Sequence, residues 1–160
     1  MKLKQIIYLF LISGILFSCV DNQKIAPKFN HLVEQFADIR VLRYKVPGFE
    51  ELSLKEKSLV YYLTQAGLAG RDIMWDQNYK HNLKIRAALE NINANYSGDK
   101  ESDDFKAFKV YLKRVWFSNG IHHHYSNDKI KPAFTRDYFE TELLQKSSTV
   151  LAPEIVAVLF

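Results

Sequence analysis

The sequence lacks most of the short motifs by which enzymes are identified, and it holds one cysteine among 160 residues. No HExxH, CxxC or helical HxxxH pattern occurs, so the common sets of zinc ligands are missing. No GxGxxG fingerprint, phosphate-binding P-loop or GxSxG elbow occurs either, which leaves nucleotide binding and serine hydrolysis without support. With one cysteine, the chain cannot form an internal disulfide. These 160 residues therefore carry no complete catalytic apparatus of their own.

A nucleic-acid footprint is also missing, because no cluster of Lys and Arg is interleaved with aromatic residues. The formal net charge is +4, and removing residues 1–18 takes away Lys2 and Lys4 and lowers it to +2. The remaining charges are of both signs and indicate an ordinary solvated surface.

The N-terminus has the layout of a secretory signal. Lys2 and Lys4 precede an apolar run over residues 6–17 that is too short to span a bilayer comfortably. Cys19 follows Ser18 at the end of this run, an arrangement similar to the lipobox of bacterial lipoproteins. A short membrane anchor, or an ordinary signal with an incidental cysteine, is the alternative. We expect a signal peptide over 1–18, lipidation of Cys19, a tether over 19–28 and a lipid-anchored protein of the bacterial cell envelope.

The rest of the chain reads as α+β and mainly helical. The capping box of Ser53 and Glu56 marks one helix start, and Thr135 after Phe134 marks another, with Phe134 placed for a hydrophobic staple. Pro153 suits the first position of a last helix. In chain order we expect a short helix over 29–36, a strand over 39–46, and helices over 53–70, 79–96 and 102–118. Two further helices are expected to start at 135 and at 153.

The apolar spacing predicts which faces are buried. In the helix over 53–70 the buried face is expected to contain Leu59, Leu63, Ala66 and Gly70. Residues 71–78 are expected to form an interhelical corner plugged by Trp75, or else a cleft wall in which Arg71 and Asp72 hold a substrate group.

The central helix over 102–118 carries one apolar stripe and ends in a polar segment. We expect Gly120 to take the left-handed conformation that closes the helix. The stripe consists of Phe105, Phe108, Leu112, Val115 and Trp116.

Three consecutive histidines, His122, His123 and His124, follow that helix, and Tyr125 comes next. Neighbouring side chains point to opposite faces in a strand and lie about 100° apart in a helix, so at most His122 and His124 are expected to face the same way. This spacing favours a loop that contacts a ligand, or hydrogen-bonds locally, over an independent metal site.

The chain ends on apolar residues without a helix cap, namely Ile155, Val156, Val158, Leu159 and Phe160. We expect this end to be uncovered, and residues 29–160 to be the front part of a longer domain that is marginally folded alone.

Two long segments resemble one enzyme family. The segments FADIRVLRYKVPGFEELSLKEKSLVYYLTQAGLAGRDIMWDQN and FKVYLKRVWFSNGIHHHYSNDKIKPAF are similar to the N-terminal region of bacterial dipeptidyl-peptidase III enzymes of the Bacteroidetes type. The resemblance covers most of residues 36–145. It implies a two-lobed zinc exopeptidase that releases dipeptides from the N-termini of oligopeptides. In that family two histidines of an HExxGH helix and a later glutamate hold the zinc.

Neither family motif occurs in these residues, so the isolated chain is expected to be inactive and to bind no zinc. The resemblance implies that a segment lining the peptide cleft is formed by Asn119, Gly120, His122, His123, His124 and Tyr125. Two alternatives stay open. One is a stand-alone helical envelope lipoprotein that binds peptides or a protein partner, and the other is a small metal module using His122 and His124.

Overall fold

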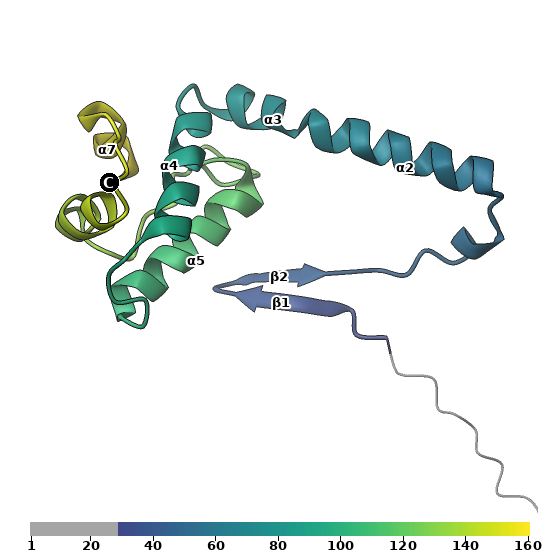
Figure 1. Ribbon diagram of the computed structural model, residues 1–160, viewed down its shortest axis with the longest axis horizontal. Helices are drawn as coiled ribbons and strands as arrows, with labels where there is room; N and C mark the ends of the chain where they lie inside the picture. The colour runs from purple at the N-terminus through teal and green to yellow at the C-terminus, as the bar shows by residue number, and fades with distance from the viewer. Residues whose placement is uncertain (1–28) are drawn as a thin grey trace, which may run out of the picture. The chain divides into compact units, whose positions relative to one another are not determined.

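The computed structural model describes residues 29–160, and those from Leu32 to Phe160 form one structural unit (Figure 1). It is mainly helical with one small antiparallel sheet, which confirms the α+β class. The expected signal peptide, Cys19 and the tether lie outside the described residues. The elements in chain order are β1 (Leu32–Phe36), β2 (Ile39–Leu42), the short 3-10 helix η1 (Phe49–Glu51), α2 (Leu54–Ala69), α3 (Arg71–Asn78), α4 (Asn82–Asn95), α5 (Asp103–Ser118), α6 (Arg136–Tyr138), the π-helical turn η2 (Phe139–Leu144) and α7 (Pro153–Leu159).

The segment expected to be a helix over 29–36 contains a strand instead. β1 pairs antiparallel with β2 across a tight turn at Ala37, whose φ of 46° is left-handed, and Phe36 lies opposite Ile39. The apolar spacing suited a short helix, but pairing with the next segment decides the conformation. Ion pairs join Glu34 to Lys113 and Asp38 to Arg114, so the hairpin is held to α5 by charge.

The core lies between α4, α5 and the segments after residue 134. Ile85, Leu89 and Ile92 of α4 are fully buried, as are Phe108 and Leu112 of α5. The predicted stripe of α5 is confirmed except for Trp116, which is 39% exposed and donates through Nε1 to Glu90.

The residues after 134 complete this core with aromatic rings. Phe134 precedes the helix cap Thr135 and lies 6.1 Å, centroid to centroid, from Phe139, which confirms the predicted staple. The expectation of an uncovered apolar end is wrong, because Ile155 and Leu159 of α7 are buried. Pro153 opens α7 as predicted.

The helix α2 is formed as predicted but is not buried. Ser53 Oγ accepts from the Glu56 N–H and the Glu56 carboxylate accepts from the Ser53 N–H, which confirms the capping box. No residue of α2 is buried, and the expected core positions Leu59 and Leu63 are 59% and 63% exposed. The predicted buried face is therefore wrong for the described residues. Within residues 29–160, no helix combines the length and the apolar character needed to cross a membrane.

Candidate functional site

An open cavity of about 530 Å³ lies where α5 gives way to the loop that carries the histidines. We call residues 119–128 the histidine loop. The cavity brings together five of the six residues predicted to line a cleft, and Asn119 contributes its backbone nearby. Its lining consists of Asn78, Gly120, His122, His123, His124, Tyr125, Ser126 and Asn127.

The end of α5 sets where the histidine loop starts. Asn119, not Gly120, takes the left-handed conformation that closes the helix, with φ 51° and ψ 41°. Asparagine tolerates this conformation because its short polar side chain can bond locally. Gly120 has φ +150°, and a Cβ atom there would lie 2.2 Å from Nδ2 of Asn82. Glycine is thus needed at 120, but for a different conformation from the one predicted.

The fully buried Asn82 ties the loop to α3 and α4. Its Nδ2 donates to the carbonyls of Trp75, at 3.1 Å, and of Asn119, at 3.4 Å. Its Oδ1 accepts from the N–H of Ile121 at 3.3 Å. The buried Ile121 N–H would otherwise be left unpaired at a cost of roughly 1–3 kcal/mol. The carbonyls of Trp75 and Asn119 each have a second donor, the Tyr79 N–H and Asn78 Nδ2.

Sequence reasoning missed both Asn82 and Asn78, whose Nδ2 also donates to the Asn119 carbonyl. The signal for Asn82 was present, because it lies three and seven residues before Ile85 and Leu89 and so shares their apolar face. A polar residue on a buried face calls for hydrogen-bond partners.

Residues 121–123 and 128–130 pair with each other and close the base of the histidine loop. His122 forms an isolated antiparallel bridge with Lys129, the N–H of His123 donates to the Asp128 carbonyl at 2.8 Å, and Ile121 and Ile130 are buried. The histidine loop is therefore anchored at both ends by the core while its tip is exposed.

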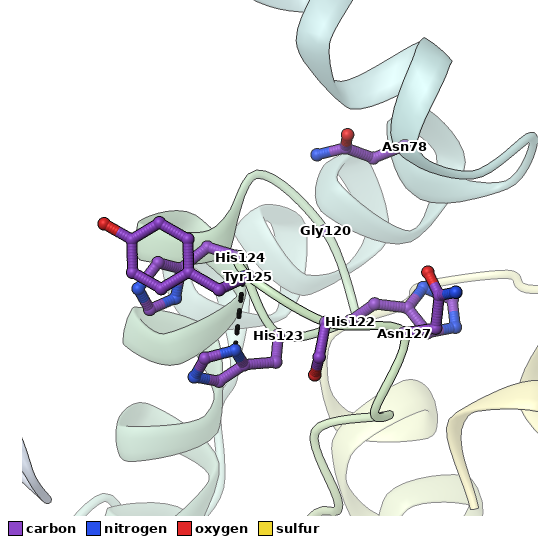
Figure 2. Close-up of a pocket in the computed structure, with 8 residues that line it drawn as sticks. Asn78, Gly120, His122, His123, His124, Tyr125 and Asn127 are labelled. Carbon is purple, nitrogen blue, oxygen red and sulfur yellow. Dashed lines mark hydrogen bonds between the residues drawn. The ribbon is translucent and has the colours of Figure 1, made fainter.

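The three histidines do not alternate as predicted. His123 and His124 stack on each other with ring centroids 4.4 Å apart, while His122 packs edge-on against Tyr79. Figure 2 shows His124 and Tyr125 on one side of the loop and His122 and Asn127 on the other. The chain turns directly after His123, since the Ser126 N–H donates to its carbonyl, so strand alternation does not apply.

These histidines do not form a recognisable zinc site. Among residues 29–160 no group of three His, Cys, Asp or Glu side chains is placed to hold a metal ion. The zinc that the family resemblance implies thus has no matching ligand set in the described part of the chain, and we assign no chemical step to it.

The corner over residues 71–78 forms as an interhelical contact. Trp75 is 4% exposed, which confirms its predicted role as the plug. Asp72 accepts from Arg86 Nη1 at 2.7 Å, and the Arg86 guanidinium lies 5.2 Å from the Trp75 ring. The hydrogen bond from Arg86 holds the pKa of the Asp72 carboxyl below its usual value. These contacts tie α3 to α4.

No protein-family model matches this chain, and no curated protein matches it. The basis for a function is therefore the cavity, its chemistry and the resemblance in the sequence.

Proposed function

We propose that this chain is the N-terminal segment of a zinc-dependent dipeptidyl-peptidase that releases dipeptides from the N-terminus of oligopeptides. The observation that carries the proposal is the open cavity lined by backbone and side-chain groups of the histidine loop. In this proposal the loop contacts the bound peptide, and the zinc and its ligands come from other parts of the enzyme.

The chemistry of the cavity supports a peptide ligand. An extended peptide presents alternating N–H and C=O groups and is recognised by donors and acceptors placed along it. Asn78 and Asn127 offer both kinds of group through their amides, and the imidazoles do so through their two ring nitrogens. The anchoring by Asn82 keeps these groups in place, because preorganised sites lose less entropy on binding.

The helix α2 supports a larger assembly. Apolar residues lie all around its circumference, including Leu59, Val60, Tyr62 and Leu63, and every one of them is exposed. A helix that is apolar on all sides is normally buried by neighbours on several sides. Further protein surface covering α2 is what the proposal of a two-lobed enzyme provides.

The proposal is tested on the native protein. An antibody against residues 105–125 is used to isolate the product from the producing cells, and its mass and its release of dipeptides from an oligopeptide are measured with and without a zinc chelator. We expect a product much heavier than 18.7 kDa whose activity the chelator abolishes. A product of this chain's own size without activity contradicts the proposal.

A second candidate is a stand-alone envelope lipoprotein that binds peptides or a protein partner. The exposed apolar surface of α2 favours it equally, because a partner protein can cover that surface. This candidate predicts a native product of the size of this chain that co-purifies with one partner in constant ratio. A Leu59→Lys, Leu63→Lys variant is expected to lose that partner, and its retention argues against the role of α2.

Both candidates place the protein at the membrane surface through a lipid on Cys19. Labelling cells with a tagged fatty acid is expected to mark the wild-type protein and not a Cys19→Ser variant. Labelling of both, or of neither, contradicts lipid anchoring at this residue.

A further inference from the structure

His123 is hydrogen-bonded inside its own loop in a way that depends on its charge. The backbone N–H of Tyr125 donates to Nδ1 of His123 at 3.2 Å (Figure 2). A neutral imidazole carries one ring hydrogen, so this bond requires that hydrogen to be on Nε2. When the ring is protonated, Nδ1 also carries a hydrogen and can no longer accept.

Protonation therefore converts an internal hydrogen bond into two neighbouring donors. The N–H of Tyr125 and the new Nδ1–H of His123 would then lie side by side at the tip of an exposed loop. A carboxylate offers two oxygens that can accept from two such donors at once, and a bond from a cationic donor to an anion is about twice as strong as a neutral one. The loop with a protonated His123 can therefore bind a carboxylate, whereas in the neutral loop the Tyr125 N–H is already paired with His123 Nδ1.

The charged residues of the paired segment beside His123 are of both signs, and the cavity lining adds no negative charge. None of the residues that line the cavity is acidic. The nearest carboxylate in the loop belongs to Asp128, which accepts from Ser126 Oγ at 2.9 Å. Lys129, opposite His122, is positive.

The elements packed against the loop add no acidic group to the cavity. α3 contributes Asn78, α5 contributes the Phe117 ring against His124, and Tyr79 lies between the rings of His81 and His122. A peptide carries an ammonium at one end and a carboxylate at the other, and these surroundings favour the carboxylate end.

The stacked partner links this binding to proton uptake. The His124 ring centroid lies 4.4 Å from that of His123, so two charged rings would repel each other. A bound anion offsets that repulsion, and the protein then takes up protons as it binds the anion. Linkage requires the reverse as well, so acidification strengthens anion binding.

We infer that the histidine loop binds the C-terminal carboxylate of a short peptide through His123 and the Tyr125 N–H, and that it does so when His123 is protonated. This inference rests on the proposed function, since that function supplies the peptide. Beyond that function, the inference specifies which end of the peptide the loop recognises and that the binding depends on pH. Histidine is the side chain that ordinarily changes charge between about pH 5 and 8.

The test compares trialanine with a free C-terminus and trialanine amide, titrated calorimetrically into the full chain. Both peptides carry the same ammonium and differ only at the carboxyl end. At about pH 5.5 the free acid is expected to bind at least about tenfold more tightly than the amide. At about pH 8 the difference is expected to disappear.

Two variants test whether the preference for the free acid depends on His123 itself or only on the number of histidines in the chain. His123→Asn keeps an acceptor near the position of Nδ1 but cannot become charged, so it is expected to lose the preference for the free acid. His31→Asn, the control, removes a histidine that lies outside the unit of residues 32–160, and it is expected to keep that preference. A preference that survives in His123→Asn overturns the assignment to His123.

The remaining outcomes distinguish this inference from the proposed function. Equal binding of acid and amide overturns the carboxylate site and leaves peptide binding intact. Binding of neither peptide overturns the carboxylate site and also removes the support for a peptide-contacting loop. Full competition by acetate or inorganic phosphate at the peptide's own concentration shows a general oxyanion site and overturns the assignment to peptides.

Discussion

The helices α2 and α5 are equally long, at 16 residues, and each begins after a serine cap, yet only one of them is buried. α5 buries six residues, whereas α2 buries none. In α5 the buried residues share one face and the charged ones lie largely outside it. In α2 the apolar residues surround the helix, and residues 58–69 carry no charge at all. Caps and length specify that a helix forms, while the distribution of apolar residues specifies how many neighbours it needs.

The largest expected effect is a difference in stability between one substitution in α5 and one in α2. Phe108→Ala in α5 removes a fully buried ring and is expected to lower the free energy of unfolding by about 3–5 kcal/mol. Leu63→Ala in α2, as the control, is expected to change it by less than about 0.5 kcal/mol. Urea unfolding followed by circular dichroism measures both, and equal losses would contradict the comparison.

The next effect concerns the anchor of the histidine loop. Asn82→Ala is expected to cost roughly 1–3 kcal/mol, because the buried Ile121 N–H loses its partner and the Trp75 and Asn119 carbonyls each lose one of two donors. Gly120→Ala is expected to be destabilising as well, since its Cβ would overlap the Asn82 side chain.

A double-mutant cycle sharpens this prediction. Gly120→Ala should cost less in the Asn82→Ala background, where the overlap is gone, although the unfavourable φ remains. Strictly additive losses, measured by denaturant unfolding, would show that Asn82 and Gly120 do not act together.

A smaller effect tests the surface of α2. Leu59→Lys together with Leu63→Lys is expected to reduce self-association and binding of a hydrophobic dye, because charges interrupt the apolar surface. The free energy of unfolding should stay within about 0.5 kcal/mol of the wild type. Sedimentation velocity measures the association, and a large loss of stability would mean that these residues are in fact buried.

The smallest effect is the pH dependence of the corner at Asp72. Its pKa is lowered in the folded state, mainly by the Arg86 hydrogen bond, so its stabilisation is full above the unfolded value of about 3.9 and is lost as the pH falls through the lowered one. The stability difference between wild type and Asp72→Asn is therefore expected to shrink below about pH 4. A difference that is constant from about pH 6 to about pH 2.5 would contradict this assignment.

Local signals in the sequence were sufficient for several helix starts but not for the surroundings of the helices. The caps at Ser53 and Thr135 and the stripe of α5 depend on residues within a few positions of one another, so they could be predicted. The strand β1 depends on pairing with β2, and the exposure of α2 depends on what packs against it. Neither can be read from a short window.

The same distinction applies to the candidate site. Periodicity and turn residues placed the histidine loop at the end of α5, and the family resemblance named five of the eight residues that line the cavity. The stacking of His123 on His124 could not be predicted, because it results from a turn within the loop. The link from Asn82 to Ile121 spans 39 residues and needs the packed core.

Hydrogen exchange of the backbone amides, read by mass spectrometry on the full chain, tests the contrast between the two helices most directly. We predict that the α5 amides exchange only through global unfolding, and that those of α2 exchange faster by on the order of a hundredfold or more. Equal protection of α2 and α5 would contradict this contrast. That result would mean that α2 is covered within this chain and that no further protein surface is needed to explain it.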